Sequence, residues 1–383
     1  MWLRGQAAVV KVTVVGAGMV GATTALRLLE DRVADDLVVV DVVDGLAKAV
    51  ALDLCQSAPV RGHATAVRGG SDYGPTEGAD LVVVTAGLPR GPGQSRADLL
   101  AANAQIVGGV AEEVARHSPG AILIVVTNPL DEMTTLAWRV SGFPSRRVIG
   151  MAGVLDTSRF RYFVAAELGA SPDQVEAVVL GSHGETMVPL PRLTVVSGRP
   201  LAELLAPERI EALVERTRDA GAEIVALLQR GSAWFAPSAA IADMAGAIAR
   251  DEHRVVSACA YLEGQYGLSG VYLGVPVRLG RGGVEEIVEL PLEPDEIDAL
   301  RAAAETVRSR AADLEALDAE PTRSGDDSVV AGTSVDGSLE DLRVRSRVRR
   351  AAEALLWERG TPPDPEMLEA LTDAAVGQLA REP

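Results

Sequence analysis

The sequence predicts an α/β protein with a doubly wound parallel sheet, a second α+β domain and a C-terminal helical extension. Short apolar runs of strand length alternate with helical stretches over roughly the first 155 residues, which is typical of a parallel sheet covered by helices on both faces. A glycine-rich turn joins the first of these strands to a helix. Further along the chain, long helices are followed by paired strands with hairpin signals, which favours a mixed α+β arrangement.

The first predicted domain covers residues 9–155. It opens with a strand over 9–15, the glycine turn, a helix over 22–30 and a strand over 37–40, which together make a βαβ unit. The alternation continues with strands over 81–85, 121–127 and 147–150 and with helices over 97–117 and 130–141.

The second predicted domain covers residues 156–312. We expect helices over 158–168, 201–229 and 238–251, strands over 175–180, 271–279 and 284–290, and a last helix from about residue 294. Residues 313–383 are predicted to form a linker rich in Ser, Gly and Asp, followed by two helices. This extension is either a hairpin that docks a partner or braces an oligomer, or a loosely attached appendage.

The composition excludes some classes of partner. A formal net charge of −18 argues against nucleic acid, because phosphate binding needs a basic face. The apolar runs are far shorter than the ~20 residues that span a bilayer, and residues 1–8 lack the layout of a signal peptide. We therefore expect a cytoplasmic protein without a membrane or nucleic-acid partner.

Few residues of this chain are suited to bind metal. Cys55 and Cys259 lie in apolar surroundings and are interpreted as buried small hydrophobic residues. Without a CxxC spacing or a Cys/His cluster, no metal site is expected. Of the histidines, His63, His117 and His253 lie in polar, surface-like stretches and need no functional role.

The turn after the first strand, Gly16 to Gly21, has the GxGxxG spacing of a Rossmann-type dinucleotide site. The first glycine allows the tight turn, the second lets a pyrophosphate approach the backbone, and the third lets helix and strand pack closely. Asp41 ends the next strand, twenty residues past Gly21. Its carboxylate is expected to accept hydrogen bonds from the adenosine ribose and to repel a 2′-phosphate, which predicts NAD rather than NADP.

Two further segments follow strands. Residues 85–96 form a loop rich in Pro and Gly that carries Arg90 and Arg96; it is either a solvated surface loop or a hinged lid that brings two guanidinium groups over an anion. Asn128 precedes a proline at the end of a strand. It either orients a ligand at the carboxyl end of the sheet or simply forms a turn.

The last candidates are an acid–base pair and a histidine. Asp156 and Arg159 are three residues apart in the first turn of a predicted helix, a spacing that commonly gives a helix cap with an ion pair. A functional interpretation requires His183, the one histidine flanked by glycines, Gly181 and Gly184, that would let a ligand approach.

Taken in order, these segments resemble the malate/lactate dehydrogenase family. The matching stretches are VGAGMVG, VDVVDG, AGLPRGPGQSR, VTNP, GVLDTSR, GSHGETMVPL, GSAWFAPSAA and YLEGQYG, and they span about residues 10 to 310. The resemblance implies that NAD is bound by Gly16, Ala17, Gly18, Met19, Val20, Gly21, Asp41, Asn103 and the backbone of Val126, Thr127 and Asn128.

The resemblance also implies the roles of the substrate-binding residues. Arg159 would clamp the α-carboxylate, Arg96 would polarise the ketone, and Asn128 would touch the substrate. His183 would give or take the hydroxyl proton and Asp156 would orient its ring. Oxidation of the alcohol needs neutral His183 and should therefore fall at acid pH.

Arg90 is implied to select the substrate. Lactate dehydrogenases generally carry glutamine at the matching position, whereas an arginine can pair with the second carboxylate of oxaloacetate. Facing the methyl group of pyruvate, it would be an unpaired charge in a closed site. The expected activity is the reversible, NAD-dependent oxidation of (S)-malate to oxaloacetate, a step of the tricarboxylic acid cycle.

Two other functions are alternatives to malate oxidation. The first is a lactate or other 2-hydroxyacid dehydrogenase of the same fold, and the second is a scaffold whose tail is the working part. The family implies a homodimer or homotetramer. The chain departs from the family pattern at Glu185, where aspartate is usual, and in residues 313–383, which have no counterpart in the family.

Overall fold

The N-terminal half of the main sheet is parallel. The computed structural model describes residues 10–89, 96–229, 231–319 and 372. Within them the parallel strands lie in the order β3 (Ala66–Gly70), β2 (Asp36–Val40), β1 (Lys11–Val15), β4 (Leu81–Val84), β5 (Ile122–Val125) and β6 (Val148–Gly150). The helices among them are α1 (Met19–Glu30), α2 (Asp44–Arg61), α3 (Arg96–His117) and α4 (Leu130–Ser141).

The antiparallel half continues the same sheet from β6. Its strands are β12 (Arg254–Glu263), β13 (Ser269–Gly280), β8 (Val179–Gly181) and β9 (Met187–Pro189), with β14 (Gly283–Ile287) paired to β13. A small second sheet joins β11 (Arg199–Pro200), β10 (Val195–Val196) and β7 (Val175–Glu176). The longer helices here are α5 (Gly153–Leu168), α6 (Pro207–Leu228), α7 (Phe235–Ala249) and α8 (Pro294–Ala319).

Short 3-10 helices connect these elements. They are η1 (Gly74–Thr76), η2 (Ser145–Arg147), η3 (Pro172–Gln174), η4 (Pro191–Leu193), η5 (Leu201–Glu203) and η6 (Gln265–Gly267). Several begin at or next to a proline, which suits the first turn of a helix because its missing N–H has no intrahelical partner there.

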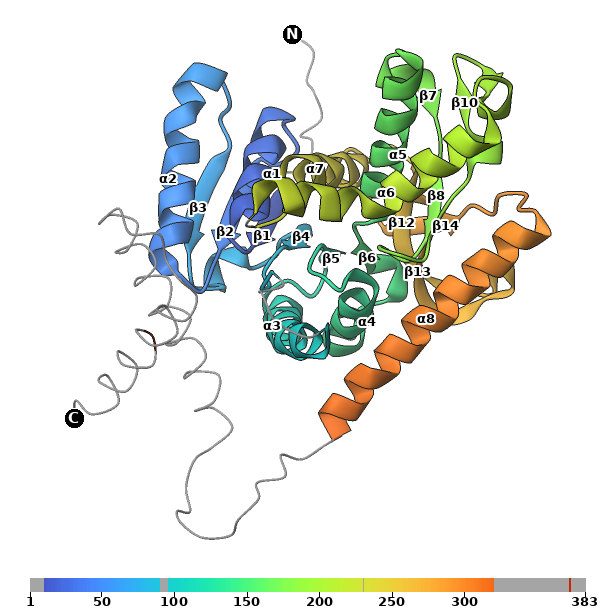
Figure 1. Cartoon of the computed structure of the whole chain (residues 1–383). Coiled ribbons are helices and arrows are strands. Elements are labelled where there is room, and N and C mark those ends of the chain that lie inside the picture. Colours follow the sequence, from blue (N-terminus) through green and yellow to red (C-terminus); the bar gives the residue numbers. More distant parts are fainter. Residues whose placement is uncertain (1–9, 90–95, 230, 320–371, 373–383) are drawn as a thin grey trace. The chain divides into compact units, whose positions relative to one another are not determined.

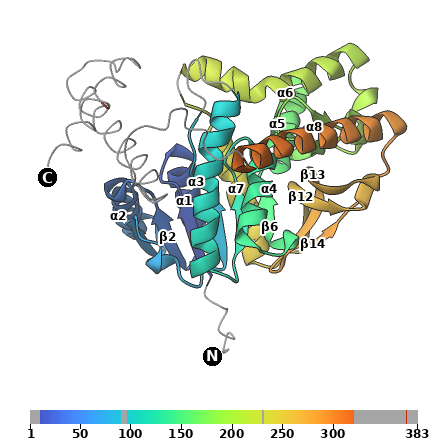
Figure 2. The same ribbon diagram turned by 90° about the horizontal axis from the view of Figure 1, so that it is seen from below.

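Helices cover both faces of the sheet, and the central strands show why. On β4, Leu81 and Val83 enter one apolar core while Val82 and Val84 enter another, as the period of two in a strand requires. The first core includes residues of α1 and α7, which pack side by side, and the second includes residues of α3 and α4 (Figure 1). Figure 2 shows α3 and α8 on the near side of the sheet. Strands buried on both faces must be apolar throughout, which explains their uninterrupted runs.

The predicted fold class is confirmed, with some elements missed or misplaced. The predicted elements did not include α2, β3 or β12. The helix expected over 201–229 begins only at Pro207, and the strand expected over 175–180 is divided between β7 and β8. The predicted linker and helices of the extension beyond residue 319 lie outside the described residues, apart from residue 372.

The two cysteines, both predicted to be buried, differ in their exposure. Cys259 is buried as expected, but Cys55 is exposed on α2, so its interpretation as a core residue was wrong. Among the described residues, no helix is both long and apolar enough to cross a membrane.

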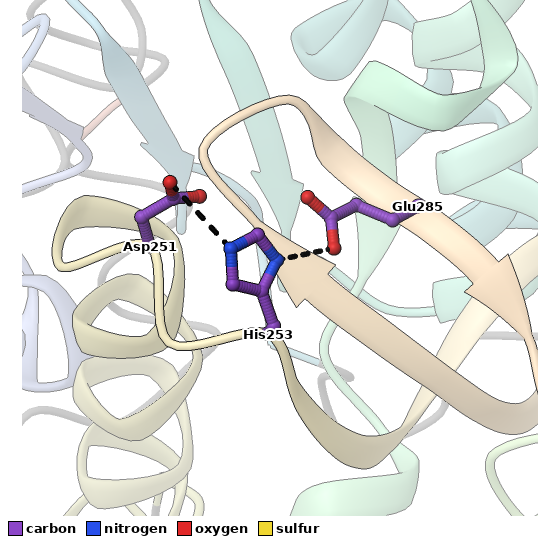
Figure 3. A group of neighbouring side chains, drawn as sticks. All are labelled: Asp251, His253 and Glu285. Carbon is purple, nitrogen blue, oxygen red and sulfur yellow. Dashed lines mark hydrogen bonds and ion pairs between the residues drawn. The ribbon is translucent and has the colours of Figure 1, made fainter.

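A polar cluster ties the turn before β12 to β14. In Figure 3 the His253 ring lies between two carboxylates: Nδ1 is 2.7 Å from Glu285 Oε2, and Nε2 is 3.7 Å from Asp251 Oδ2. One possible metal-ligand atom from each of the three residues lies within 4.8 Å of the other two. Because the two ring nitrogens point to opposite sides, the arrangement fits a protonated imidazole between two anions better than a shared metal ion.

This cluster should stabilise the fold in a pH-dependent way. The hydrogen bond and charge of Glu285, followed by the charge of Asp251, raise the pKa of His253 above its ordinary 6.5. The stabilisation is therefore fully present below pH 6.5 and is lost as the pH rises through the raised pKa. We predict that Glu285→Gln lowers the melting temperature at pH 5.5 but not at pH 9.

The matched control is Glu286→Gln on the same strand. Glu286 pairs with Arg278 and not with the histidine, so the effect of its substitution should not change between these pH values. Equal destabilisation by Glu285→Gln at both pH values would contradict the assignment.

Candidate active site

The carboxyl ends of four adjacent parallel strands place polar and glycine residues at one edge of the sheet. Gly16 follows β1, Asp41 follows β2, Thr85 follows β4, and Asn128 lies just past β5. In open parallel sheets this edge forms the ligand crevice. The sequence order of these residues thus becomes a single site once the strands pair.

The glycine turn has the geometry that a dinucleotide requires. Gly16 has φ +102°, a conformation that favours glycine. A Cβ at Gly21 would overlap the carbonyl oxygen of Gly16, so this glycine allows α1 to pack against the turn. A Cβ at Gly18 would meet nothing within 4 Å, so open space remains beside its backbone. Because no side chain caps α1 and no acid lies in its first turn, the helix N-terminus is suited to an anion.

Asp41 holds the turn against β2. It is only 8% exposed, and its two oxygens accept hydrogen bonds from the backbone N–H groups of Ala17 and Val43, each at 2.8 Å. A carboxylate offers about four acceptor sites in all. The residue therefore shapes the phosphate turn and also presents a negative group at the strand end, which fits a ribose diol.

Asn103 lies behind the crevice and braces it. Its side chain is fully buried; Nδ2 donates to the carbonyls of Asn128 (2.6 Å) and Leu88 (3.1 Å), while Oδ1 accepts from the N–H of Leu88 (2.8 Å). Thr127 donates to the carbonyl of Ala86 at 2.6 Å. These bonds join the turn after β5 to the start of the loop after β4, whereas Asn128 itself is exposed.

His183 and Asp156 form the central pair. His183 follows β8 between Gly181 and Gly184, whose φ values are +85° and +141°. Its Nδ1 lies 2.9 Å from Oδ2 of Asp156, which is buried in the first turn of α5. With Nδ1–H donated to a carboxylate, the neutral ring presents Nε2 as its proton acceptor.

Burial and charge act on this ring in opposite directions. Desolvation alone would lower the pKa of His183, but the charge and hydrogen bond of Asp156, helped by the charge of Asp131, raise it above 6.5 despite the opposing charge of Arg159. A half-buried ring with a raised pKa is suited to general acid–base work near neutral pH.

Arg159 lies beside the pair. Its Nη1 is 3.5 Å from Oδ1 of Asp156, and its buried Nε has no hydrogen-bond partner. Burial lowers the pKa of Arg159, and Asp156 only partly offsets that effect. Burying a guanidinium N–H without a hydrogen-bond acceptor costs free energy, and a bound anion would supply that acceptor. The site therefore fits a carboxylate ligand.

The structure does not describe every predicted site residue. Arg90 and the side chain of Arg96 lie outside the described residues. Glu185, where the family pattern has aspartate, is exposed. Conversely, sequence reasoning missed Asp131, whose carboxylate accepts a hydrogen bond from the backbone N–H of His183. The available signal was a pair of acids, Asp131 and Glu132, in the first turn of the helix that follows Asn128.

Two protein-family models match the chain and together cover most of its length. Residues 10–150 match the lactate/malate dehydrogenase NAD binding domain, and residues 153–317 match the lactate/malate dehydrogenase alpha/beta C-terminal domain. The chain belongs to the lactate/malate dehydrogenase family. The resemblance expected from the sequence and the NAD cofactor are thereby confirmed.

Individual members of this family are highly similar to the chain. The malate dehydrogenase of Salinibacter ruber is 52% identical over 307 residues, covering 80% of this chain and 98% of that protein. A solved structure of malate dehydrogenase from Salinibacter ruber matches with a TM-score of 0.77 at 51% identity, covering 80% of this chain and 98% of that one. The malate dehydrogenase of Synechocystis is 54% identical over 298 residues, covering 78% of this chain and 92% of that protein.

A lactate dehydrogenase is also structurally similar. The enzyme of Cryptosporidium parvum, solved with lactic acid and nicotinamide adenine dinucleotide, matches with a TM-score of 0.78 at 39% identity, covering 82% of this chain and 99% of that one. The fold by itself therefore does not distinguish malate from lactate dehydrogenase activity, and the side chains of the site must determine the substrate.

Two glycine substitutions should separate cofactor binding from folding. Gly18→Ala adds a methyl group to open space where a pyrophosphate would approach, so we predict weaker NADH binding at an unchanged melting temperature. Gly21→Ala places a methyl group on the Gly16 carbonyl and should cost about 1–3 kcal/mol of stability. Fluorescence titration with NADH and thermal melting measure the two effects; unaltered NADH affinity in Gly18→Ala would refute the placement of the phosphates.

Proposed function

We propose that the chain is an NAD-dependent malate dehydrogenase that interconverts (S)-malate and oxaloacetate. The observation that carries the proposal is the hydrogen bond between His183, whose side chain is only 18% exposed, and the buried Asp156, beside Arg159, whose Nε lacks a partner. This arrangement offers a proton acceptor and a carboxylate receptor within one site. Curated malate dehydrogenases at about 50% identity over most of the chain support the assignment.

Arg159 binds the α-carboxylate of the substrate. Its planar guanidinium can form two parallel hydrogen bonds to a carboxylate, and burial strengthens them because little water competes. The same contact would orient the carbon that carries the hydroxyl toward His183. Asn128, exposed at the strand end, and Arg96 are assigned to the substrate oxygens on the basis of their sequence positions.

His183 moves the hydroxyl proton through Nε2. In malate oxidation the neutral ring accepts the proton, and Asp156 stabilises the imidazolium that forms. In oxaloacetate reduction the protonated ring returns it. Because the pKa of His183 is raised above 6.5, oxidation weakens as the pH falls through that pKa, and reduction weakens as the pH rises through it.

NAD is held at the carboxyl edge of the parallel strands. The pyrophosphate would be held by Gly16, Ala17, Gly18, Met19, Val20 and Gly21 and the ribose by Asp41, while Val126, Thr127 and Asn128 would hold the nicotinamide end. When bound, NAD supplies the hydride acceptor. Asn103 acts on the cofactor indirectly, because its side chain is occupied in bracing the crevice.

Arg90 determines which 2-hydroxyacid is accepted. Its guanidinium would pair with the second carboxylate of oxaloacetate or malate in the closed site. The rival activity, lactate oxidation, would leave that charge unpaired at a cost of several kcal/mol. A purely structural scaffold is disfavoured because it has no need of a His–Asp pair beside an arginine whose buried Nε lacks a hydrogen-bond partner.

The remaining assignments follow from this activity. We propose domains over 9–155 and 156–312, an extension over 313–383, a homo-oligomer, a cytoplasmic location and a role in the tricarboxylic acid cycle. The acidic composition, with a formal net charge of −18, supports the absence of a nucleic-acid partner.

The substrate assignment is tested by exchanging Arg90. Wild-type protein should reduce oxaloacetate far better than pyruvate. Arg90→Gln should lose about 100-fold or more in kcat/KM for oxaloacetate, because the second carboxylate loses its partner, and should gain activity toward pyruvate. NADH oxidation followed by absorbance measures both reactions.

The matched control is Arg90→Lys, which keeps the positive charge without the planar fork. It should still prefer oxaloacetate, at a reduced rate. A wild-type preference for pyruvate would overturn the proposed function.

A further inference from the structure

The main chain of His183 is held by a different acid from the one that holds its ring. Asp131, in the first turn of α4, accepts on Oδ2 a hydrogen bond from the backbone N–H of His183 at 3.0 Å. Its Oδ1 accepts a bond from the thiol of Cys259, on β12, at 3.1 Å. Both oxygens of this buried carboxyl are thus used at the proposed proton-transfer site.

The position of Asp131 disfavours its charged form. It is 3% exposed, and desolvation raises its pKa despite the hydrogen bonds from Cys259 and His183. Burial likewise raises the pKa of Cys259 well above its ordinary value, so the thiol remains a donor. The other charged groups acting on Asp131 include Asp156 on α5, which opposes its ionisation. A charge buried at such a cost is weak evidence for a contribution to stability, which leaves the positioning of its hydrogen-bond partners as the role to test.

The backbone around His183 explains why an anchor is needed. Gly181 and Gly184 have positive φ values of +85° and +141°, and glycine residues leave the chain free to adopt many conformations. Asp156 fixes the direction of the ring through Nδ1 but does not hold the main chain. An acceptor on the His183 amide supplies the second point of attachment.

We infer that Asp131 is a positioning residue that sets the location of His183 relative to the substrate, with Cys259 holding the Asp131 carboxyl in place. His183 then depends on two acids from the two halves of the molecule, Asp131 on α4 and Asp156 on α5. The inference rests on the proposed function, in which His183 transfers the proton. A shift of the ring slows the chemical step more than it weakens substrate binding.

The neighbouring acid provides a matched comparison. Glu132 is equally buried on the same helix, but its carboxyl faces Arg310 of α8 at 3.8 Å. Burial, and then the charge of Asp131, raise the pKa of Glu132 to about 7. Its replacement therefore removes a buried acid next to Asp131 without touching His183.

The test compares Asp131→Ala, Asp131→Asn and Glu132→Ala in the full-length protein. Asp131→Ala leaves the His183 amide without an acceptor and should reduce kcat about tenfold or more, with KM for oxaloacetate unchanged within about twofold. Asp131→Asn keeps an acceptor oxygen and should restore most of kcat. Glu132→Ala should keep the wild-type kcat, and thermal melting reports the folding of each variant.

Three results would overturn the inference: a wild-type kcat in Asp131→Ala, an Asp131→Asn variant as slow as Asp131→Ala, or an equal loss in Glu132→Ala. Hydrogen exchange of the His183 amide provides a readout that does not depend on activity. It should be slow in wild type and Asp131→Asn; rapid exchange in the wild type refutes the anchor even if Asp131→Ala fails to fold. Slow exchange in a protein that does not reduce oxaloacetate would instead refute the proposed function alone.

Discussion

The hydrogen bond between His183 and Asp156 depends on how closely α5 approaches β12. A Cβ at Gly153, in the first turn of α5, would overlap the side chain of Ser257 on β12, so glycine is required for this approach. Ser257 in turn donates to the carbonyl of Val179 on β8 at 2.6 Å. The first turn of α5, which carries Asp156, is therefore fixed against the strand that leads to His183. At this position Asp156 raises the pKa of the ring more than burial lowers it.

The same region joins the two halves of the sheet. Gly150 on β6 pairs with Cys259 on β12, and a Cβ at Gly150 would lie 2.7 Å from both Cys259 Cβ and Thr134 Oγ1. Cys259 also donates to Asp131, and Asp131 accepts the backbone N–H of His183, so hydrogen bonds connect this junction of the two halves to His183.

Much of this could be predicted from the sequence because the relevant signals are local. The central strands are buried on both faces and show as apolar runs, and Gly16, Gly18 and Gly21 have spacings dictated by the turn. The elements that were not predicted lack such signals. Helix α2 contains Pro59 and exposes the apolar residues Leu52 and Val60, and β3 ends in two glycines.

The contacts between distant segments could not be predicted in this way. The bonds from Asp131 to His183 and Cys259 join residues 52 and 128 positions apart, and only the folded sheet brings them together. The exposed position of Cys55 was missed for a related reason, since an apolar sequence neighbourhood does not define which face of a helix is buried.

Asp156 keeps the half-buried His183 basic enough to exchange a proton near neutral pH. Nuclear magnetic resonance titration of the His183 ring, in wild type and in Asp156→Asn, measures this most directly. The account predicts a pKa above 6.5 in wild type and a lower pKa in Asp156→Asn, because desolvation is then less opposed. An identical pKa in the two proteins would contradict it.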